Sequence, residues 1–154
     1  RPSTGKVIWI KEGDFIKQHD IDILDDDKIS FFNNNAIGTA HGDIVLNNSE
    51  VVIYDFSKNN FFKYLNPELK SINLKTKYQG RSEIITDNGL FIEDTVNGRL
   101  LYFDSKGEIL WQYVNKALNN EHIYYLNWSR ILYKPNDITK VNRFLESKKG
   151  CSNE

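Results

Sequence analysis

Several residue types are scarce in this chain, and each scarcity excludes a class of protein. The 154 residues include no methionine, one cysteine and three histidines. The single Cys151 cannot form an intrachain disulfide, and no apolar run approaches the ~18 residues of a membrane span. A formal charge of −1 gives no reason to expect nucleic acid or an anionic membrane as partner. Because no initiating methionine is present, we expect a piece of a longer protein.

The common motifs for nucleotide, esterase and metal sites are also absent. There is no G-x-x-x-x-G-K-[ST], no G-x-G-x-x-G and no G-x-S-x-G. His19, His41 and His122 do not cluster with cysteine at zinc spacing. Asp25–Asp27 could suggest calcium, but the run lacks the spaced oxygens and the glycine of an EF-hand, so we interpret it as a solvated turn. We therefore expect no metal and no cofactor.

Aromatic residues and asparagine are abundant, and both favour an all-β protein with many turns. Three segments of the form turn-then-strand align without gaps at intervals of about fifty residues. They are Ser3–Trp9, Ser57–Lys63 and Ser105–Trp111. Gly5, Asn59 and Gly107 share one position in this alignment, where we expect a left-handed backbone.

Further hairpin signals divide each repeat into four short strands. Glu83–Thr86, the turn Asp87–Gly89 and Leu90–Glu93 form one predicted hairpin. A period near ~50 with four strands is typical of a β-propeller blade. The prediction is a last strand of one blade at 6–10, full blades at about 17–65 and 70–114, and a short blade at about 120–134. A β-sandwich is the alternative fold.

The end of the chain has a different pattern. Ile138, Val141, Phe144 and Leu145 fall on one helical face. We predict a helix at 137–147 and a loose tail from Lys148, so that the division is propeller blades at 1–136 and helix with tail at 137–154. About three blades do not close a ring, so the chain supplies the C-terminal half of a larger propeller or pairs with a second copy or another chain.

The sharpest candidate site is at Gln18–Asn35. Ile21 and Ile23 alternate with aspartates, as in a half-buried strand, and the hairpin that follows brings His19 close to Asn33–Asn35. In a propeller the first strand of a blade lines the channel, so His19 could reach a ligand there; a structural histidine that bridges strands is the alternative. Asp20 points away from His19 and is not expected to orient it. The asparagine run either holds ligand oxygens or ends the strand.

The other candidates are weaker. His41 lies in a loop-like stretch with turn residues, and His122 precedes a predicted strand at Ile123–Tyr125. Trp9, Trp111 and Trp128 are interpreted as blade-packing residues. Repeated T-G-x-Φ-Φ-W strands also occur in quinoprotein propellers, which keeps a quinoprotein-like domain as a further possibility.

One stretch carries a resemblance to a known family. Thr4-Gly5-Lys6-Val7-Ile8-Trp9, a spacer with Phe15, Gln18-His19-Asp20, and then Ile-x-Ile-Leu-x(3)-Lys-Ile-x-Phe-Phe-Asn resemble the bacterial arylsulfotransferases over residues 4–35. The resemblance implies a six-bladed propeller that moves a sulfuryl group between phenols without a nucleotide sulfate donor. It implies an aryl sulfate or phenol as small-molecule partner, the remaining propeller blades as protein partner, and a periplasmic or secreted location.

The resemblance also implies roles for particular residues. His19 matches the histidine of the Q-H-D motif and is our candidate catalytic nucleophile in the channel, with Asn33 and Asn34 as candidate substrate-binding residues. The family's other histidine and its arginine lie upstream of the T-G-x-Φ-Φ-W strand, where this chain begins. The family's S-R pair is Ser49-Glu50 here. A non-catalytic propeller that binds a ligand or protein is the alternative function.

Overall fold

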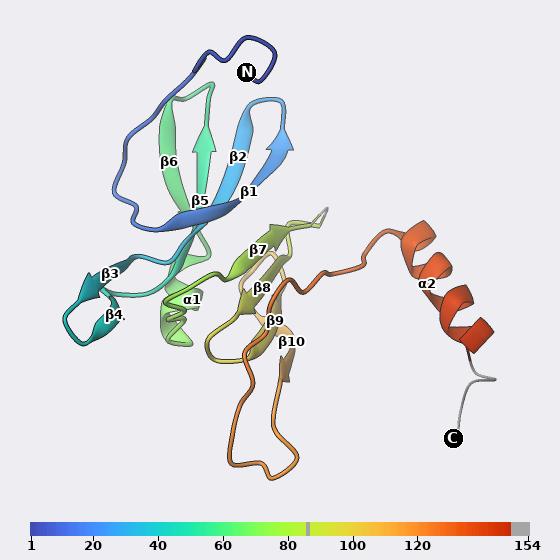
Figure 1. Ribbon diagram of the computed structural model, residues 1–154. Helices are drawn as coiled ribbons and strands as arrows, with labels where there is room; N and C mark the ends of the chain where they lie inside the picture. Colours follow the sequence, from blue (N-terminus) through green and yellow to red (C-terminus); the bar gives the residue numbers. More distant parts are fainter. Residues whose placement is uncertain (86, 149–154) are drawn as a thin grey trace.

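The computed structural model describes residues 1–85 and 87–148. They form a mostly β structure with two four-stranded antiparallel sheets, a small hairpin and a C-terminal helix (Figure 1). The first sheet has the strand order β1-β2-β5-β6. Its strands are β1 (Gln18–Asp25), β2 (Lys28–Asn33), β5 (Glu50–Asp55) and β6 (Asn60–Tyr64).

The second sheet repeats this arrangement, with the order β10-β9-β8-β7. Its strands are β7 (Arg81–Ile84), β8 (Leu90–Asp94), β9 (Arg99–Phe103) and β10 (Ile109–Val114). Both full sheets that the sequence predicted are therefore confirmed as four-stranded units, whereas their interpretation as propeller blades stays a prediction. The predicted hairpin between β7 and β8 is also present, and Thr86 of that prediction lies outside the described residues.

The repeat is visible in the backbone. Gly5, Asn59 and Gly107 have φ angles of 62°, 53° and 88°. The left-handed position predicted from the alignment is thus confirmed in all three copies. In the second and third copies the turn leads directly into the last strand of a sheet, β6 or β10.

Strands predicted at the two ends of the repeat array are wrong. Residues 6–10 are irregular, and the stretch 120–134 contains only an isolated bridge between Lys116 and Ile123. The reason is pairing, because a strand is stable only when a neighbouring strand satisfies its backbone groups. No described strand pairs with residues 6–10, and in 120–134 only Ile123 pairs, in its single bridge to Lys116.

Three elements complete the chain. The hairpin of β3 (Ala36–Thr39) and β4 (Gly42–Val45) and the short helix α1 (Asn66–Ser71) were not predicted, although Pro67 near the start of α1 is a usual helix signal. The predicted C-terminal helix is confirmed as α2 (Pro135–Lys148), which has no buried residue and projects away from the sheets (Figure 1). The predicted tail lies outside the described residues from 149 on. No described helix is long and apolar enough to cross a membrane.

The core lies between the two sheets and includes Leu69 of α1. Phe32 and Val51 of the first sheet share a buried cluster with the inner face of the second sheet. The fully buried members are Phe32, Val51, Leu69, Leu74, Leu90, Ile92, Leu101 and Phe103. Each such side chain contributes about 1.5–3 kcal/mol by leaving water, so the two sheets stabilise each other as one unit.

The edge strand β1 alternates as predicted, but its aspartates and not its isoleucines face the protein interior. Ile21 and Ile23 are 65% and 83% exposed, whereas Asp20 and Asp22 are partly buried. The cause lies in the second sheet, because the Asp20 carboxylate accepts hydrogen bonds from Arg81 Nε (3.0 Å) and the Ser82 backbone N–H (2.8 Å). A charged contact between β1 and β7 therefore decides which side of β1 faces inward.

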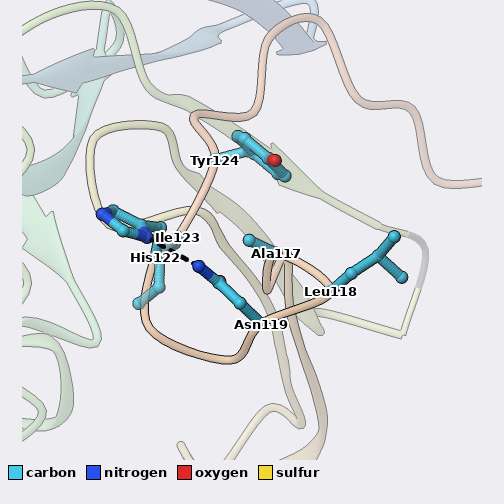
Figure 2. Close-up of a pocket in the computed structure, with 6 residues that line it drawn as sticks. All are labelled: Ala117, Leu118, Asn119, His122, Ile123 and Tyr124. Carbon is cyan, nitrogen blue, oxygen red and sulfur yellow. Dashed lines mark hydrogen bonds between the residues drawn. The ribbon is translucent and has the colours of Figure 1, made fainter.

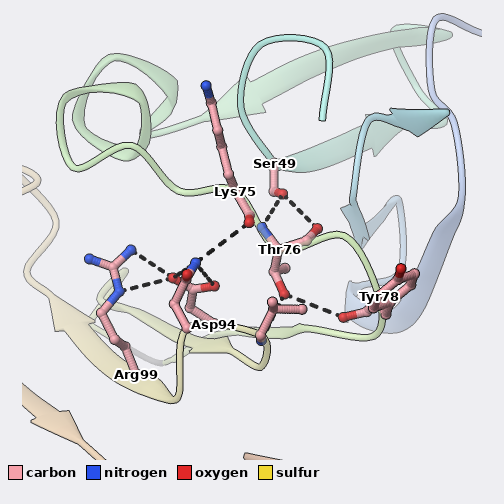
Figure 3. A network of polar contacts seen from close by, with 8 residues as sticks. Ser49, Lys75, Thr76, Tyr78, Asp94 and Arg99 are labelled. Carbon is pink, nitrogen blue, oxygen red and sulfur yellow. Dashed lines mark hydrogen bonds and ion pairs between the residues drawn. The ribbon is translucent and has the colours of Figure 1, made fainter. Parts of the chain in front are cut away.

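The segment between the sheets is fixed by polar contacts around Thr76 (Figure 3). Ser49, directly before β5 of the first sheet, donates through Oγ to the Thr76 carbonyl and accepts from the Thr76 N–H, at 3.2 and 3.1 Å. Thr76 Oγ1 accepts at 3.2 Å from the Val96 N–H, in the turn between β8 and β9 of the second sheet. Nearby, Asp94 holds Arg99 in an ion pair. Thr76 thus links both sheets immediately before Gln79 and Gly80, which line the site described next.

Candidate functional site

A cavity of about 270 Å³ lies where the two first strands meet. Residues from four parts of the chain line it. They are His19 and Asp20 of β1, Gln79 and Gly80 with Arg81 at the start of β7, Glu93 of β8, and Asn127 with Trp128 of the C-terminal segment. The histidine singled out in the sequence therefore faces an opening, together with one guanidinium, two carboxylates and an indole.

Asn34 holds the imidazole of His19. Asn34 Nδ2 donates to the backbone carbonyls of Thr76 and Gln79, each at 2.8 Å, and this fixes the orientation of the amide. Its Oδ1 then lies 2.6 Å from His19 Nε2. A carbonyl oxygen only accepts hydrogen bonds, so Nε2 must carry the proton. In the neutral ring Nδ1 is then the atom with the free lone pair, and no described residue hydrogen bonds to it.

The neighbourhood of His19 and the asparagine run, which the sequence predicted, is confirmed. Asn33 is fully buried; its Oδ1 accepts from the Ile16 N–H (2.9 Å) and its Nδ2 donates to Glu50 (3.1 Å). Asn34 is also buried, and neither amide lines the cavity. Direct contact of Asn33 and Asn34 with a substrate stays a prediction; the role visible in the structure is to fix the strand end and the ring of His19.

Arg81 is the cation of the cavity, and the sequence analysis did not identify it. Its Nε donates to Asp20, and its Nη1 donates to the Ser129 carbonyl at 2.9 Å. Both partners of this salt bridge are largely buried, with side-chain exposures of 14% and 12%. As predicted, Asp20 does not orient His19. It instead positions the guanidinium on the neighbouring strand.

Glu93 closes the cavity from the second sheet. It is fully buried, and it accepts hydrogen bonds from Thr95 Oγ1 (2.9 Å) and from the Ser129 N–H. Both of its oxygens therefore have protein donors, which lowers the cost of keeping a carboxylate out of water. The bond to Ser129 also holds the C-terminal segment against the second sheet, with Trp128 at the cavity.

The sequence contained a signal that could have found Arg81. Gln18-His19-Asp20 opens the first strand of the first sheet, and Gln79-Gly80-Arg81 leads into the first strand of the second. The two tripeptides occupy corresponding places and both contain left-handed residues, with φ of 55° at Asp20, 51° at Gln79 and 90° at Gly80. A search for the Q-x-[DR] pattern across repeats would have marked Arg81 as the counterpart of Asp20.

Asp22 lies on β1 beyond this cavity, in a neighbouring groove of about 610 Å³ that Glu83 and Tyr133 also line. Burial raises the pKa of the Asp22 carboxyl, and the carboxylates of Asp20 and Glu83 raise it further. Residues 1–85 and 87–148 contain no group of three acidic, histidine or cysteine side chains arranged to hold a metal ion.

The remaining histidines lie elsewhere. His41 is exposed in the turn of the β3–β4 hairpin, as its turn residues predicted. His122 lines a separate pocket of about 420 Å³, and Figure 2 shows its ring beside Asn119, with 3.3 Å between Nδ1 and the amide nitrogen. None of the six lining residues is a carboxylate, lysine or arginine. This pocket therefore lacks the charged partners found around His19.

Comparison with known proteins gives one result. A family model described as "Arylsulfotransferase (ASST)" matches residues 1–116. The match includes His19, Asn34, Arg81 and Glu93 and ends before the segment that carries Trp128. No curated protein and no solved structure matches the chain.

Proposed function

Because this chain belongs to the arylsulfotransferase family, we propose that it transfers a sulfuryl group between phenolic compounds with His19 as the nucleophile. The observation that carries the proposal is the setting of His19. Its ring lines a cavity beside a guanidinium, and Asn34 engages Nε2 so that Nδ1 is left for chemistry.

The proposed reaction has two balanced steps. In the first, the Nδ1 lone pair of neutral His19 forms a bond to sulfur while the bond between sulfur and the aryl oxygen breaks, and the phenolate leaves with that electron pair. In the second step, the oxygen of an acceptor phenol attacks the same sulfur, and the phenol proton passes to solvent or base. The bond between Nδ1 and sulfur breaks, and its electron pair returns to the imidazole as the lone pair. A neutral imidazole is a suitable nucleophile near pH 7.

Arg81 is the proposed partner of the transferred group. The sulfuryl oxygens are anionic, and the leaving phenolate gains charge as the bond breaks. A fixed cation offsets such charge most effectively when it is already oriented. Asp20 and the Ser129 carbonyl supply that orientation, since they hold Nε and Nη1 of Arg81.

The proposed setting is a six-bladed propeller to which this chain supplies the C-terminal half. The support is the equal strand order of the two sheets and the contact of β1 and β2 with β7, which brings the first strands together. Exposed Ile21 and Ile23 would meet further blades, contributed by the same polypeptide or by another. In this proposal residues 1–136 belong to the propeller and 137–154 form a terminal helix and tail.

A second candidate function is ligand binding without transfer. Two of the four ionisable side chains at the cavity, Asp20 and Glu93, are carboxylates. At Gly80 there is no room for a side chain, because a Cβ would lie 2.7 Å from Phe32 Cε1. No second histidine can therefore occupy the position in the second sheet that corresponds to His19. A cavity with one imidazole and one guanidinium could hold an aryl anion and leave it unchanged.

The test is a transfer assay on the whole natural polypeptide with 4-nitrophenyl sulfate as donor and phenol as acceptor. We expect release of nitrophenolate to fall to background in His19→Ala and to persist in His41→Ala, whose imidazole is exposed on the hairpin. Mass spectrometry of donor-treated wild type should find one SO₃ group on the peptide that contains His19. An unchanged rate in His19→Ala would exclude the proposed nucleophile, and binding of the donor without any transfer would favour the second candidate.

A further inference from the structure

We propose that Trp128 is the side chain of the His19 cavity that recognises the aryl ring of a substrate. The proposal rests on the proposed function and deepens it, because it names the side chain that selects aromatic over aliphatic sulfate esters. Trp128 lies outside the family match, which ends at residue 116, so this recognition element comes from a segment that the family comparison does not cover.

Trp128 differs from the other two tryptophans. Trp9 packs against Tyr54 and Phe56, and Trp111 packs against Phe91 and Tyr102, as the sequence predicted for blade-packing residues. Trp128 has no aromatic neighbour in the described chain and is 68% exposed. The packing interpretation is therefore wrong for Trp128. A large apolar ring left open beside a cavity is instead what ligand pockets use to bind flat molecules.

The backbone beneath the indole is anchored. Ser129 donates its N–H to Glu93 and accepts at its carbonyl from Arg81, and the Leu126 N–H donates to the Thr95 carbonyl at 3.2 Å. Trp128 itself has a φ of 64°, in the left-handed region that bulky residues rarely adopt. Such a conformation persists only where the surroundings hold it. The exposed ring thus stands on a fixed segment of chain and needs little ordering when a ligand binds.

The charge beside the ring fits a particular ligand. The Arg81 guanidinium lies over the Trp128 ring, 5.3 Å from its centroid, in a cation–π contact. Nε and Nη1 have protein acceptors, whereas Nη2 has none among the described residues. An aromatic side chain next to an available cationic donor matches a molecule whose aromatic ring carries an anionic group close by, as an aryl sulfate does through its ester oxygen. The cavity volume of about 270 Å³ is at the small end for ligand sites and suits a single ring.

The experiment compares two anions that cannot transfer a sulfuryl group. Benzenesulfonate and methanesulfonate carry the same charge, and only the first has a ring. We expect calorimetric titration of the full chain to show tighter binding of benzenesulfonate. Trp128→Leu should weaken benzenesulfonate binding about 2- to 13-fold, the range for one aromatic contact, and leave methanesulfonate binding unchanged. Trp128→Phe should retain most of the preference, and Trp9→Leu should retain all of it, because Trp9 does not line the cavity.

A measurement on the unmodified protein guards against a variant that fails to fold. The indole N–H resonance of Trp128, assigned by its loss in Trp128→Phe, should shift more on addition of benzenesulfonate than of methanesulfonate, because only the first anion has a ring to contact the indole. An equal affinity for both anions in wild type, or an unmoved Trp128 resonance at saturation, overturns the inference. These probes do not depend on transfer, so the binding preference can stand if the transfer assay fails, and transfer can stand if the preference is absent.

Discussion

The two sheets have the same strand order, yet their first strands bring different chemistry to one cavity. The first sheet contributes an imidazole at His19, and the second contributes a glycine at the corresponding Gly80 and a guanidinium one residue later. The difference follows from packing. His19 lies on an edge strand with room for its ring, whereas a side chain on Gly80 would meet Phe32 and Thr76. The local space of each sheet therefore decides which reactive group it can carry.

The largest effect is expected from filling the space at Gly80. In Gly80→Ala the new Cβ would lie 2.7 Å from both Phe32 Cε1 and Thr76 Cγ2, on a residue with φ of 90°. We expect the free energy of unfolding to fall by about 2–4 kcal/mol, because overpacking and backbone strain add. Urea denaturation measures this change in the free energy of unfolding. Gly5→Ala is the matched control, since φ is 62° there and nothing lies within 4 Å. It should cost about 1–2 kcal/mol, the cost of the left-handed backbone alone, and equal losses in the two variants would contradict the packing argument.

The link between the sheets is tested at Asp20. Asp20→Asn retains one acceptor and loses a charge-assisted bond to Arg81 or to the Ser82 N–H, so we expect a loss of about 1–2 kcal/mol in unfolding free energy. Asp43→Asn removes the exposed ion pair with Lys17 and should cost less than about 0.5 kcal/mol. Similar values for both variants would show that the Asp20 contact does not couple the sheets.

The tautomer of His19 is tested at Asn34. Nitrogen NMR of the neutral imidazole should show a protonated Nε2 and an unprotonated Nδ1 in wild type. Asn34→Ala should give a mixture of tautomers and reduce sulfuryl transfer about 10- to 100-fold, the range known for loss of the hydrogen-bond partner of a metal-binding histidine. A wild-type spectrum with the proton on Nδ1 would reverse the assignment of the reacting atom.

The smallest effect is expected at Asp22. A carboxyl whose pKa is raised by folding binds more protons in the folded state, so stability falls as pH rises from the ordinary value near 3.8 through the raised value. Asp22→Asn removes this penalty and should stabilise the protein at neutral pH by at most about 0.5 kcal/mol, because the group is partly exposed and screened. The difference should vanish in acid. A variant that is less stable than wild type at pH 7 would show that the charged form is favoured.

The sequence predicted those features that depend on neighbours within one repeat. The left-handed turns at Gly5, Asn59 and Gly107, the two four-stranded sheets and the closeness of His19 to Asn34 all follow from local pattern and pairing. The strand predicted at 6–10 failed because local pattern says nothing of whether a partner strand is present.

The cavity itself could be predicted only in part. His19 was identified from its motif, but Arg81 and Trp128 come from positions about sixty and a hundred residues away along the chain. Their convergence depends on how one sheet packs against the next, and no periodicity within either sheet encodes that. The inverted face of β1 has the same origin, since the Asp20 contact with Arg81 lies between sheets.

The cavity is assembled from the entry points of successive repeats, and this has a consequence for change by mutation. Each entry tripeptide lies where the first strand of its sheet begins, and its backbone pairs with the next strand, through His19 and Phe32 in the first sheet and Arg81 and Glu93 in the second. These ladder bonds are made by the backbone and not by the side chains at the opening. A side-chain substitution in one entry tripeptide could therefore alter the reactivity of the whole cavity while the hydrogen-bonded ladders stay intact. Proteins built in this manner can acquire a new specificity, or lose an old one, by substitutions in one entry tripeptide at a time.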